Sequence, residues 1–207
     1  MAKEKISEEN LQKKKFLNVG GGNKNTAIPD LYNNWEHLLL DIDKSVEPDV
    51  LCDARELTSR PAAEFDAIYC SHNLEHYLRH EGLKVLKGFL HVLKEDGFVH
   101  IKVPDIQQVM RTVIEKNLDI GDVLYPSSVG PITVRDVMYG YEKQIEETGQ
   151  DYYAHKTGFS PKSLQKFLFQ AGFPNVAIIE NRNHWEIIAV AFKSTPSEEI
   201  KKEFNLK

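Results

Sequence analysis

The feature of this sequence that most limits its fold is a series of five short apolar segments. They read KFLNVG, EHLLLDID, PDVLCD, FDAIYCS and GFVHIKVP. None alternates strictly between apolar and polar residues, so strands formed by them would be buried on both faces, as the strands of a parallel sheet are. Helical patterns lie between several of the segments. The sequence therefore predicts an α/β protein with a mainly parallel sheet.

Two helices and a hairpin are predicted around these strands. The segment HEGLKVLKGFLHVLKEDG should form a helix that ends at Gly97, and SPKSLQKFLFQAG one that begins after Ser160 and ends at Gly172. Two apolar runs around residues 181–183 predict a closing antiparallel hairpin. The apolar face of the first helix includes Leu83, Leu86, Leu90 and Leu93.

Residues 105–156 do not follow the simple alternation of strand and helix. They contain an amphipathic helix, a loop rich in Gly and Pro, and a second helical segment, VRDVMYGYEKQIEE. We expect a helical insertion after strand five, over the carboxyl edge of the sheet, where open α/β sheets bind ligands. We expect the chain to divide into a polar arm (1–14), one domain (15–193) and a polar tail (194–207). The apolar face of the amphipathic helix comprises Ile106, Val109, Met110, Val113 and Ile114.

Length and composition fit one globular domain, with 207 residues, 41% hydrophobic and 28% charged residues, and a net charge of −5. The acidic balance predicts no nucleic-acid partner. No signal peptide and no run of about 18 apolar residues is recognisable, so we expect a cytoplasmic protein without membrane contact. Cys52 and Cys70 lie in apolar runs and are predicted to be reduced, buried thiols.

A glycine triplet, Gly20 to Gly22, follows the first strand directly. Glycines there let the backbone turn sharply and let a ligand approach closely, although a tight loop without a ligand would look the same. The second strand ends in Asp41, which is placed to accept hydrogen bonds from the two ribose hydroxyls of an adenosine, or is a solvated acid. Asp53, after the third strand, would meet the adenine amino group or cap the following turn.

The choice between NAD and S-adenosylmethionine depends on the connection after the glycines. About sixteen residues, interrupted by Pro29, separate the loop from the second strand, so a full crossover helix hardly fits. A dinucleotide needs a helix N-terminus for its pyrophosphate. S-adenosylmethionine has no phosphate and is therefore favoured over NAD.

The stretch YCSHNLEHYL, residues 69–78, spells H-x-x-E-H with His72, Glu75 and His76. On a helix this spacing can hold zinc and a catalytic carboxylate, with Glu142 as a candidate third ligand. It also fits a corner after the fourth strand, with Glu75 and His76 in the first turn of the next helix. The zinc interpretation leaves the glycine loop and Asp41 unexplained.

Taken in order, these motifs resemble class I S-adenosylmethionine-dependent methyltransferases. The resemblance spans roughly residues 15–193 and is carried by LNVGGG, LLLDID, CDARELT, FDAIYCSHNLEH, LKEDGFVHIKVPD and the final helix and hairpin. It implies a Rossmann-like seven-stranded sheet whose last strand is antiparallel, and S-adenosylmethionine as cofactor. The stunted first connection and the VPD…AHKTGF segments look like a bacterial subgroup of largely unassigned methyltransferases, some thought to act on saccharides.

The resemblance also implies positions for the cofactor. The glycines would approach its amino-acid end, Asp41 its ribose, and Asp53 its adenine. Asn18 stands where many members have an acid. The implied cofactor-binding residues are Asn18, Gly20, Gly21, Gly22, Asp41, Ile42, Asp53, Ala54 and Ser71.

Methyl transfer from a sulfonium is an in-line displacement, and a hydroxyl or ammonium acceptor must also lose a proton. A histidine suits that task. The candidates are His72, His76 and His155, with Glu75 as a fourth, and His72 is preferred because it is nearest the strand tip. Each has a structural alternative: backbone bonding at the corner, helix packing, or a loop position. Tyrosines 125, 139, 141, 152 and 153 either line an acceptor pocket or pack the insertion onto the sheet.

The predicted function is therefore S-adenosylmethionine-dependent methyl transfer to oxygen or nitrogen of a small-molecule or saccharide acceptor, without a metal. Three alternatives remain: a non-catalytic S-adenosylmethionine-binding module, a zinc hydrolase using His72, Glu75 and His76, and an NAD-dependent oxidoreductase. His80, His91 and His100 are expected on helix or strand surfaces and have no assigned role.

Overall fold

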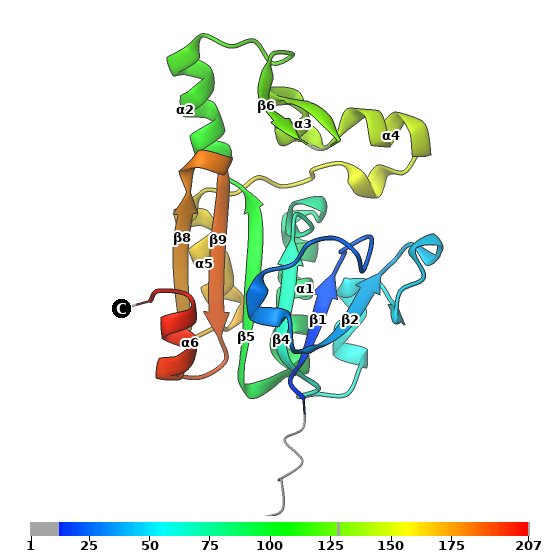
Figure 1. Ribbon diagram of the computed structural model, residues 1–207, viewed down its shortest axis with the longest axis vertical. Coiled ribbons are helices and arrows are strands. Elements are labelled where there is room, and N and C mark those ends of the chain that lie inside the picture. Colours follow the sequence, from blue (N-terminus) through cyan, green and yellow to red (C-terminus); the bar gives the residue numbers. More distant parts are fainter. Residues whose placement is uncertain (1–12, 128, 207) are drawn as a thin grey trace, which may run out of the picture.

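The core of the fold is one seven-stranded sheet in the order β3-β2-β1-β4-β5-β9-β8. The computed structural model describes residues 13–127 and 129–206 (Figure 1). The pairs among β1 to β5 are parallel, whereas β9 is antiparallel to β5 and β8 is antiparallel to β9. The predicted α/β fold with an antiparallel C-terminal hairpin is confirmed. The strands are β1 (Lys15–Val19), β2 (Glu36–Asp41), β3 (Val50–Leu51), β4 (Phe65–Ser71), β5 (Leu93–Pro104), β8 (Asn175–Asn181) and β9 (Glu186–Phe192).

The strand order reverses between β1 and β4. The chain runs from β1 outward through β2 to β3, and then returns to add β4 and β5 on the other side of β1. Such a reversal opens a crevice at the carboxyl ends of the strands, which is where open α/β sheets bind ligands. In the described part of the chain, the helical element between β1 and β2 is a single 3-10 turn, η1 (Asp30–Tyr32), so the expected absence of a full crossover helix is confirmed.

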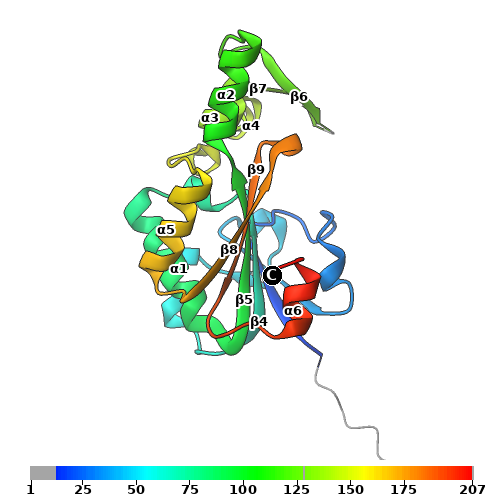
Figure 2. The same ribbon diagram turned by 90° about the vertical axis from the view of Figure 1, so that its left-hand side faces the viewer.

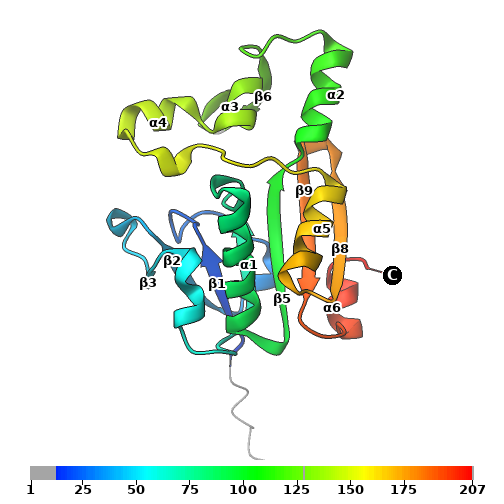
Figure 3. The same ribbon diagram turned by 180° about the vertical axis from the view of Figure 1, so that it is seen from behind.

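Helices cover both faces of the sheet, as Figure 2 shows with the sheet on edge. On one face lie α1 (Arg79–Val92) and α5 (Pro161–Ala171), which Figure 3 shows in front of the sheet. Their apolar stripes pack on sheet residues such as Leu17, Ile68 and Val99 in the larger core cluster. The opposite face carries a smaller aromatic cluster, which is covered by residues around η1 and by α6 (Glu198–Glu203).

The predicted polar tail takes part in this second cluster. Ile200 and Phe204 pack against the sheet beside Phe98. His100, which the sequence placed on a surface, is only 4% exposed and its ring contacts those of Tyr69 and Phe204. That expectation was wrong because β5 is an inner strand and both of its faces are covered. Most of the predicted N-terminal arm, residues 1–12, lies outside the described residues.

Two helix ends test the sequence signals. Helix α5 begins after Ser160, whose hydroxyl accepts a hydrogen bond from the Ser163 amide, and it ends at Gly172 with φ 108°, as predicted. Helix α1 instead ends at Val92, well before Gly97. Leu93 already pairs with Phe65 as the first residue of β5. The sheet therefore competes successfully with the last helical turn.

The insertion is less helical than predicted. It comprises α2 (Ile106–Lys116), a small hairpin of β6 (Val123–Ser127) and β7 (Gly130–Thr133), α3 (Val134–Tyr139), α4 (Glu142–Thr148) and η5 (Asp151–Tyr153). It lies beyond the carboxyl ends of the central strands, at the top of Figure 1. The second predicted helix is broken at Gly140, where φ is 102°. Met110 and Ile114 are exposed, because α2 buries Val109 and Thr112 instead.

Two further observations concern cysteines and membranes. Cys52 and Cys70 are free thiols, of which Cys70 is buried and Cys52 is half-buried. Among the residues that the structure describes, each helix is too short or too polar to cross a membrane.

Candidate active site

An open cleft lies at the carboxyl ends of β1, β2 and β4, where the strand order reverses. Its empty volume, including the open mouth, is about 910 Å³. The glycine loop, the ends of β2 and β3, the corner after β4 and the segment 152–156 form its walls. Its lining residues include Gly20, Gly22, Asp41, Ile42, Asp43, Asp53, Ala54, Arg55, His72, His76, Tyr77, Glu81, Tyr152, Tyr153 and Lys156.

The glycine loop folds back tightly over the strand ends. Gly20 and Gly22 have φ values of 66° and 62°, in the left-handed region that favours glycine. The Gly20 amide donates to the Leu40 carbonyl at 2.8 Å. A Cβ on Gly20 would lie 2.0 Å from Asn73 Nδ2, whereas one on Gly22 would have no heavy atom within 4 Å. The loop is thus packed from below and open toward the cleft.

Asp41 ties this loop to the end of β2. Its Oδ2 accepts a hydrogen bond from the Gly22 amide at 3.2 Å, and its Oδ1 accepts one from the Asp43 amide at 3.0 Å. The side chain nevertheless lines the cleft. Each carboxylate oxygen has a second acceptor position, so Asp41 retains capacity for ligand hydroxyls.

Asn18, Gly21 and Ser71 are three predicted cofactor-binding residues that lie next to residues of the cleft in the sequence. As far as the described residues show, they are not part of its lining. Asn18 is buried, with Nδ2 3.3 Å from His37 Nε2, and a Cβ on Gly21 would lie 2.4 Å from the Asn18 side chain. Close packing of the amide under Gly21 therefore holds the loop in place.

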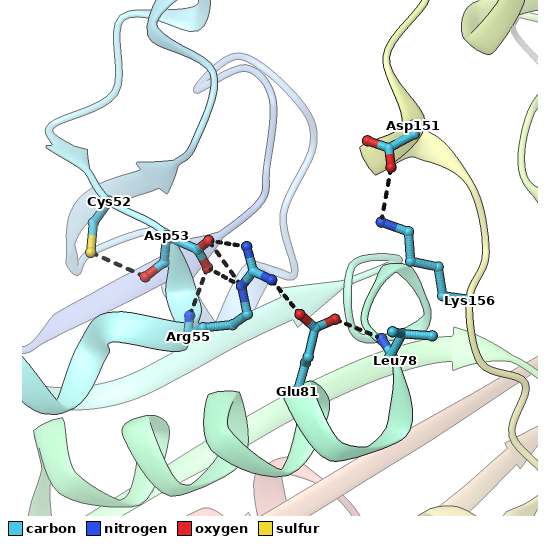
Figure 4. A network of polar contacts seen from close by, with 7 residues as sticks. All are labelled: Cys52, Asp53, Arg55, Leu78, Glu81, Asp151 and Lys156. Carbon is cyan, nitrogen blue, oxygen red and sulfur yellow. Dashed lines mark hydrogen bonds and ion pairs between the residues drawn. The ribbon is translucent and has the colours of Figure 1, made fainter.

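Asp53 belongs to an ionic network that the sequence did not reveal (Figure 4). Its Oδ1 accepts a hydrogen bond from the Arg55 amide at 2.9 Å, which caps the turn η3 (Ala54–Ser59), and the carboxylate also binds the Arg55 guanidinium. Arg55 reaches on to Glu81 in α1. Burial disfavours the charged form of Asp53, but Arg55 outweighs this effect and lowers the pKa of Asp53. The predicted turn cap at Asp53 is therefore formed, and because Asp53 also lines the cleft, its contact with an adenine stays a prediction.

His72 occupies the corner after β4 with a left-handed φ of 50°. Its Nε2 lies 3.1 Å from Glu186 Oε2 and its Nδ1 lies 3.5 Å from Glu75 Oε1. Burial by itself favours the neutral ring, but the two carboxylates outweigh this effect and raise the pKa of His72 well above its ordinary value. Both ring nitrogens thus face acids, which argues against the preference for His72 as the proton acceptor.

Glu75 and His76 lie in a single 3-10 turn, η4 (Leu74–His76), and not in the first turn of α1, which begins at Arg79. The expected helical H-x-x-E-H arrangement is therefore not formed. Glu142, the candidate third zinc ligand, pairs with Arg135 at the surface. The described residues therefore do not provide the helix and the third ligand that the zinc-hydrolase interpretation requires.

The strap, residues 149–160, brings His155 to this turn. It crosses above the carboxyl ends of the central strands (Figure 1). The amides of Lys156 and Thr157 donate to the Glu75 carbonyl at 2.8 and 3.1 Å. The His155 ring then lies 5.0 Å from the His76 ring, measured between centroids. Together with His72, all three predicted histidines thereby lie around buried Glu75.

A second pocket lies between the insertion and the sheet, and it shares His72 with the cleft. Tyr125 and Trp185 stack in it, with ring centroids 5.4 Å apart. Of the tyrosines singled out by the sequence, Tyr125 and Tyr141 line this pocket, Tyr152 and Tyr153 line the cleft, and Tyr139 is exposed. The pocket is lined by His72, Pro104, Tyr125, Ile132, Asp136, Val137, Tyr141, His155, His184 and Trp185.

Solved structures of low sequence identity share this architecture. An S-adenosylmethionine-dependent methyltransferase from Archaeoglobus fulgidus is 16% identical, with a TM-score of 0.53 over 87% of this chain and 86% of that one. A Burkholderia thailandensis N1-methyltransferase, solved with 1,6-didemethyltoxoflavin and S-adenosylhomocysteine, is 17% identical, with a TM-score of 0.51 over 88% and 72%. A Methanosarcina mazei S-adenosylmethionine-dependent methyltransferase is 12% identical, with a TM-score of 0.52 over 87% and 92%.

Sequence comparison alone gives no such relation, since neither a protein-family model nor a curated protein matches the chain. The likeness therefore rests on the arrangement of the elements. The seven-stranded sheet with its antiparallel end agrees with the fold of these solved structures. The chain has the Rossmann-like fold of class I S-adenosylmethionine-dependent methyltransferases.

Proposed function

We propose that this protein binds S-adenosylmethionine in the cleft and transfers its methyl group to a small-molecule or saccharide acceptor held in the second pocket. The observation that carries the proposal is the glycine loop bonded to Asp41 at the strand-order reversal, directly beside a pocket that shares His72. Ligands of open α/β sheets bind at this position.

The residues of the cleft fit the cofactor. Gly22 leaves its side of the loop free of side chains, and Ile42 and Tyr77 supply apolar surface for an adenine. Asp41 and Asp43 offer acceptors for hydroxyl and ammonium groups. The single 3-10 turn after the loop provides no long helix N-terminus for a pyrophosphate, which favours this cofactor over a dinucleotide. When bound, it supplies a methyl group on a positively charged sulfur.

The chain's own contribution is to align the reactants and exclude water. The hydroxyl of Tyr152 donates to Asp43 at 3.2 Å, which fastens the strap across the cleft. The acceptor would approach from the second pocket, where stacked Tyr125 and Trp185 suit the face of a sugar or another ring. Alignment of nucleophile, methyl and sulfur in a shielded site is the main requirement of an in-line displacement.

We place the loss of the acceptor's proton at the boundary between the cleft and the pocket. His76 lines the cleft and His155 lines the pocket, with Glu75 beneath them. His72 closes the same boundary, but carboxylates occupy both of its ring nitrogens. The group of Glu75, His76 and His155 is therefore proposed to serve the acceptor.

Calorimetry with S-adenosylmethionine and S-adenosylhomocysteine tests the cofactor assignment. We expect one molecule bound per chain, and Asp41→Asn should weaken binding by about 1–3 kcal/mol, the scale for losing charged hydrogen bonds. Asp30→Asn, in η1 outside the cleft lining, is the matched control and should bind like the wild type.

Absence of binding to the wild-type protein would overturn the proposal. Equal binding by Asp41→Asn and the wild type would overturn the role of Asp41. Release of S-adenosylhomocysteine in the presence of a panel of saccharides would then separate catalysis from cofactor binding alone.

A further inference from the structure

We infer that Glu75, His76 and His155 bind one divalent transition-metal ion at the boundary between the cleft and the second pocket. Each residue offers one ligand atom, and these atoms all lie within 4.8 Å of one another. The ligand set differs from the helical H-x-x-E-H arrangement, since the carboxylate is a ligand and the third donor comes from the strap.

The first observation is the state of Glu75. Its side chain is almost fully buried, and neither carboxylate oxygen accepts a hydrogen bond from any residue that the structure describes. The nearest cationic atom, His72 Nδ1, lies 3.5 Å away, while the other nitrogen of that ring is closer to Glu186. His72 compensates part of the charge of Glu75 from 3.5 Å away, but it is shared with Glu186. Neither Glu75 oxygen is hydrogen-bonded within the described residues, and a bound cation would complete the compensation.

The second observation is the orientation of His155. Its Nδ1 lies 2.9 Å from the Val137 carbonyl, which can only accept a hydrogen bond. Nδ1 must therefore carry the proton, and Nε2 keeps a lone pair. Donation of the second ring nitrogen to a backbone carbonyl is the usual support of a metal-binding histidine.

His76 has the same kind of support. Its Nδ1 lies 3.2 Å from the Ala154 carbonyl, and its Nε2 lies 3.1 Å from the His72 carbonyl. A neutral ring has one proton and can satisfy one of these carbonyls. The unprotonated nitrogen then directs its lone pair at a carbonyl oxygen, which is unfavourable. Rotation of the whole ring would turn this lone pair toward an ion between His76 and His155.

The backbone holds the three ligands close together without the ion. The strap is bonded to the Glu75 carbonyl, and the His155 amide donates to the Tyr139 carbonyl at 3.0 Å. Gly140 permits this approach, because a Cβ there would lie 2.4 Å from the Tyr153 carbonyl oxygen. Binding of an ion would require the three ligand atoms, which lie within 4.8 Å of one another, to move closer together.

The donor types indicate the kind of ion. Two imidazole nitrogens and one carboxylate suit Zn²⁺, Fe²⁺, Co²⁺ or Mn²⁺ better than Ca²⁺ or Mg²⁺, which prefer oxygen ligands. Three protein ligands leave positions open for another molecule. The role of these open positions rests on the proposed methyl transfer: an acceptor hydroxyl would bind at an open position of the ion, which would lower the pKa of the hydroxyl.

Titration of the chelator-treated, full-length protein with Co²⁺ tests the site, because bound Co²⁺ has visible absorption bands that can be followed directly. We expect one Co²⁺ per chain, displaced by Zn²⁺. His155→Ala and Glu75→Gln should each weaken Co²⁺ binding by at least about tenfold. His80→Ala, an exposed histidine of α1, is the matched control and should bind Co²⁺ like the wild type.

Circular dichroism will show whether each variant is folded. If Glu75→Gln does not fold, His155→Ala, a substitution in a loop, still tests the site. Failure of the wild type to bind Co²⁺ stoichiometrically would overturn the inference, as would equal weakening by His80→Ala and His155→Ala. Calorimetry with S-adenosylhomocysteine on the metal-free protein is a separate measurement. If the protein binds S-adenosylhomocysteine but not Co²⁺, only the metal site is contradicted. If it binds Co²⁺ but not S-adenosylhomocysteine, only the proposed function is contradicted.

Discussion

Gly20 and Gly22 have similar backbone angles but different surroundings. Both have positive φ, so any side chain is strained there by about 1–2 kcal/mol. A methyl group on Gly20 would also collide with Asn73, whereas one on Gly22 would meet no heavy atom within 4 Å. The two positions therefore separate the cost of backbone strain from the cost of crowding.

We predict that Gly20→Ala lowers the free energy of unfolding more than Gly22→Ala does, by about 1–3 kcal/mol, the usual scale of overpacking. Urea denaturation measures both. Asn73→Ala removes the two colliding atoms nearest to the new methyl group and leaves only a Cβ at 3.1 Å, so in that background most of the difference between Gly20→Ala and Gly22→Ala should disappear. Equal costs in the original background would contradict the crowding argument.

The candidate site also shows which residues could be recognised from sequence. Gly20, Gly22 and Asp41 follow strands directly, and parallel strands bring their carboxyl ends together, so their proximity was predictable. The pairing of His72 with Glu186 joins residues 114 positions apart. Nothing local in either segment indicates it, and the same applies to Arg55 with Glu81.

At the scale of elements, helix α6 shows how a polar segment can still close a core. Its sequence is mostly charged, but Phe204, just after it, places its ring 5.5 Å from that of Phe98 and 5.1 Å from that of His100. The periodicity of a six-residue helix was too short to reveal this contact. The sheet face that needs covering is known only once β5 is placed inside the sheet.

We predict that Phe204→Ala lowers the free energy of unfolding by about 1–3 kcal/mol, less than for a fully buried phenylalanine because Phe204 is half-buried. Lys202→Ala, an exposed residue of the same helix, is the control and should change stability little. Chemical denaturation measures both variants. A negligible effect of Phe204→Ala would show that the tail does not stabilise the sheet.

For the whole molecule, buried His100 links stability to pH. Its Nε2 is buried and accepts or donates no hydrogen bond within the described residues, and its Nδ1 lies 3.4 Å from the Tyr32 hydroxyl. Burial, assisted by the charge of Lys102 and opposed by that of Glu186, lowers the pKa of His100 to about 4. The unfolded chain, with an ordinary histidine pKa, therefore binds more protons between these two values.

We predict that stability falls as the pH decreases from about 6.5 to about 4, with His100 contributing up to about 3 kcal/mol. The sign follows because protons favour the unfolded state in that window. His100→Phe keeps an aromatic ring beside Tyr69 and Phe204 and should flatten the profile. Urea unfolding at a series of pH values checks this, and parallel profiles for the two proteins would contradict it.

The sequence by itself determined the α/β class, the antiparallel end, the glycine loop and Asp41, because strand burial, hairpins and strand-end residues are encoded in neighbouring positions. The three residues of the proposed metal site were also recognised from the sequence, as candidate proton acceptors. Only the tertiary structure decided that His76 meets the strap 78 residues later, at Ala154 and His155, instead of sharing a helix with His72. The physical reason is that the strap bonds to the Glu75 carbonyl, and such a contact between distant segments exists only after the sheet and insertion have packed.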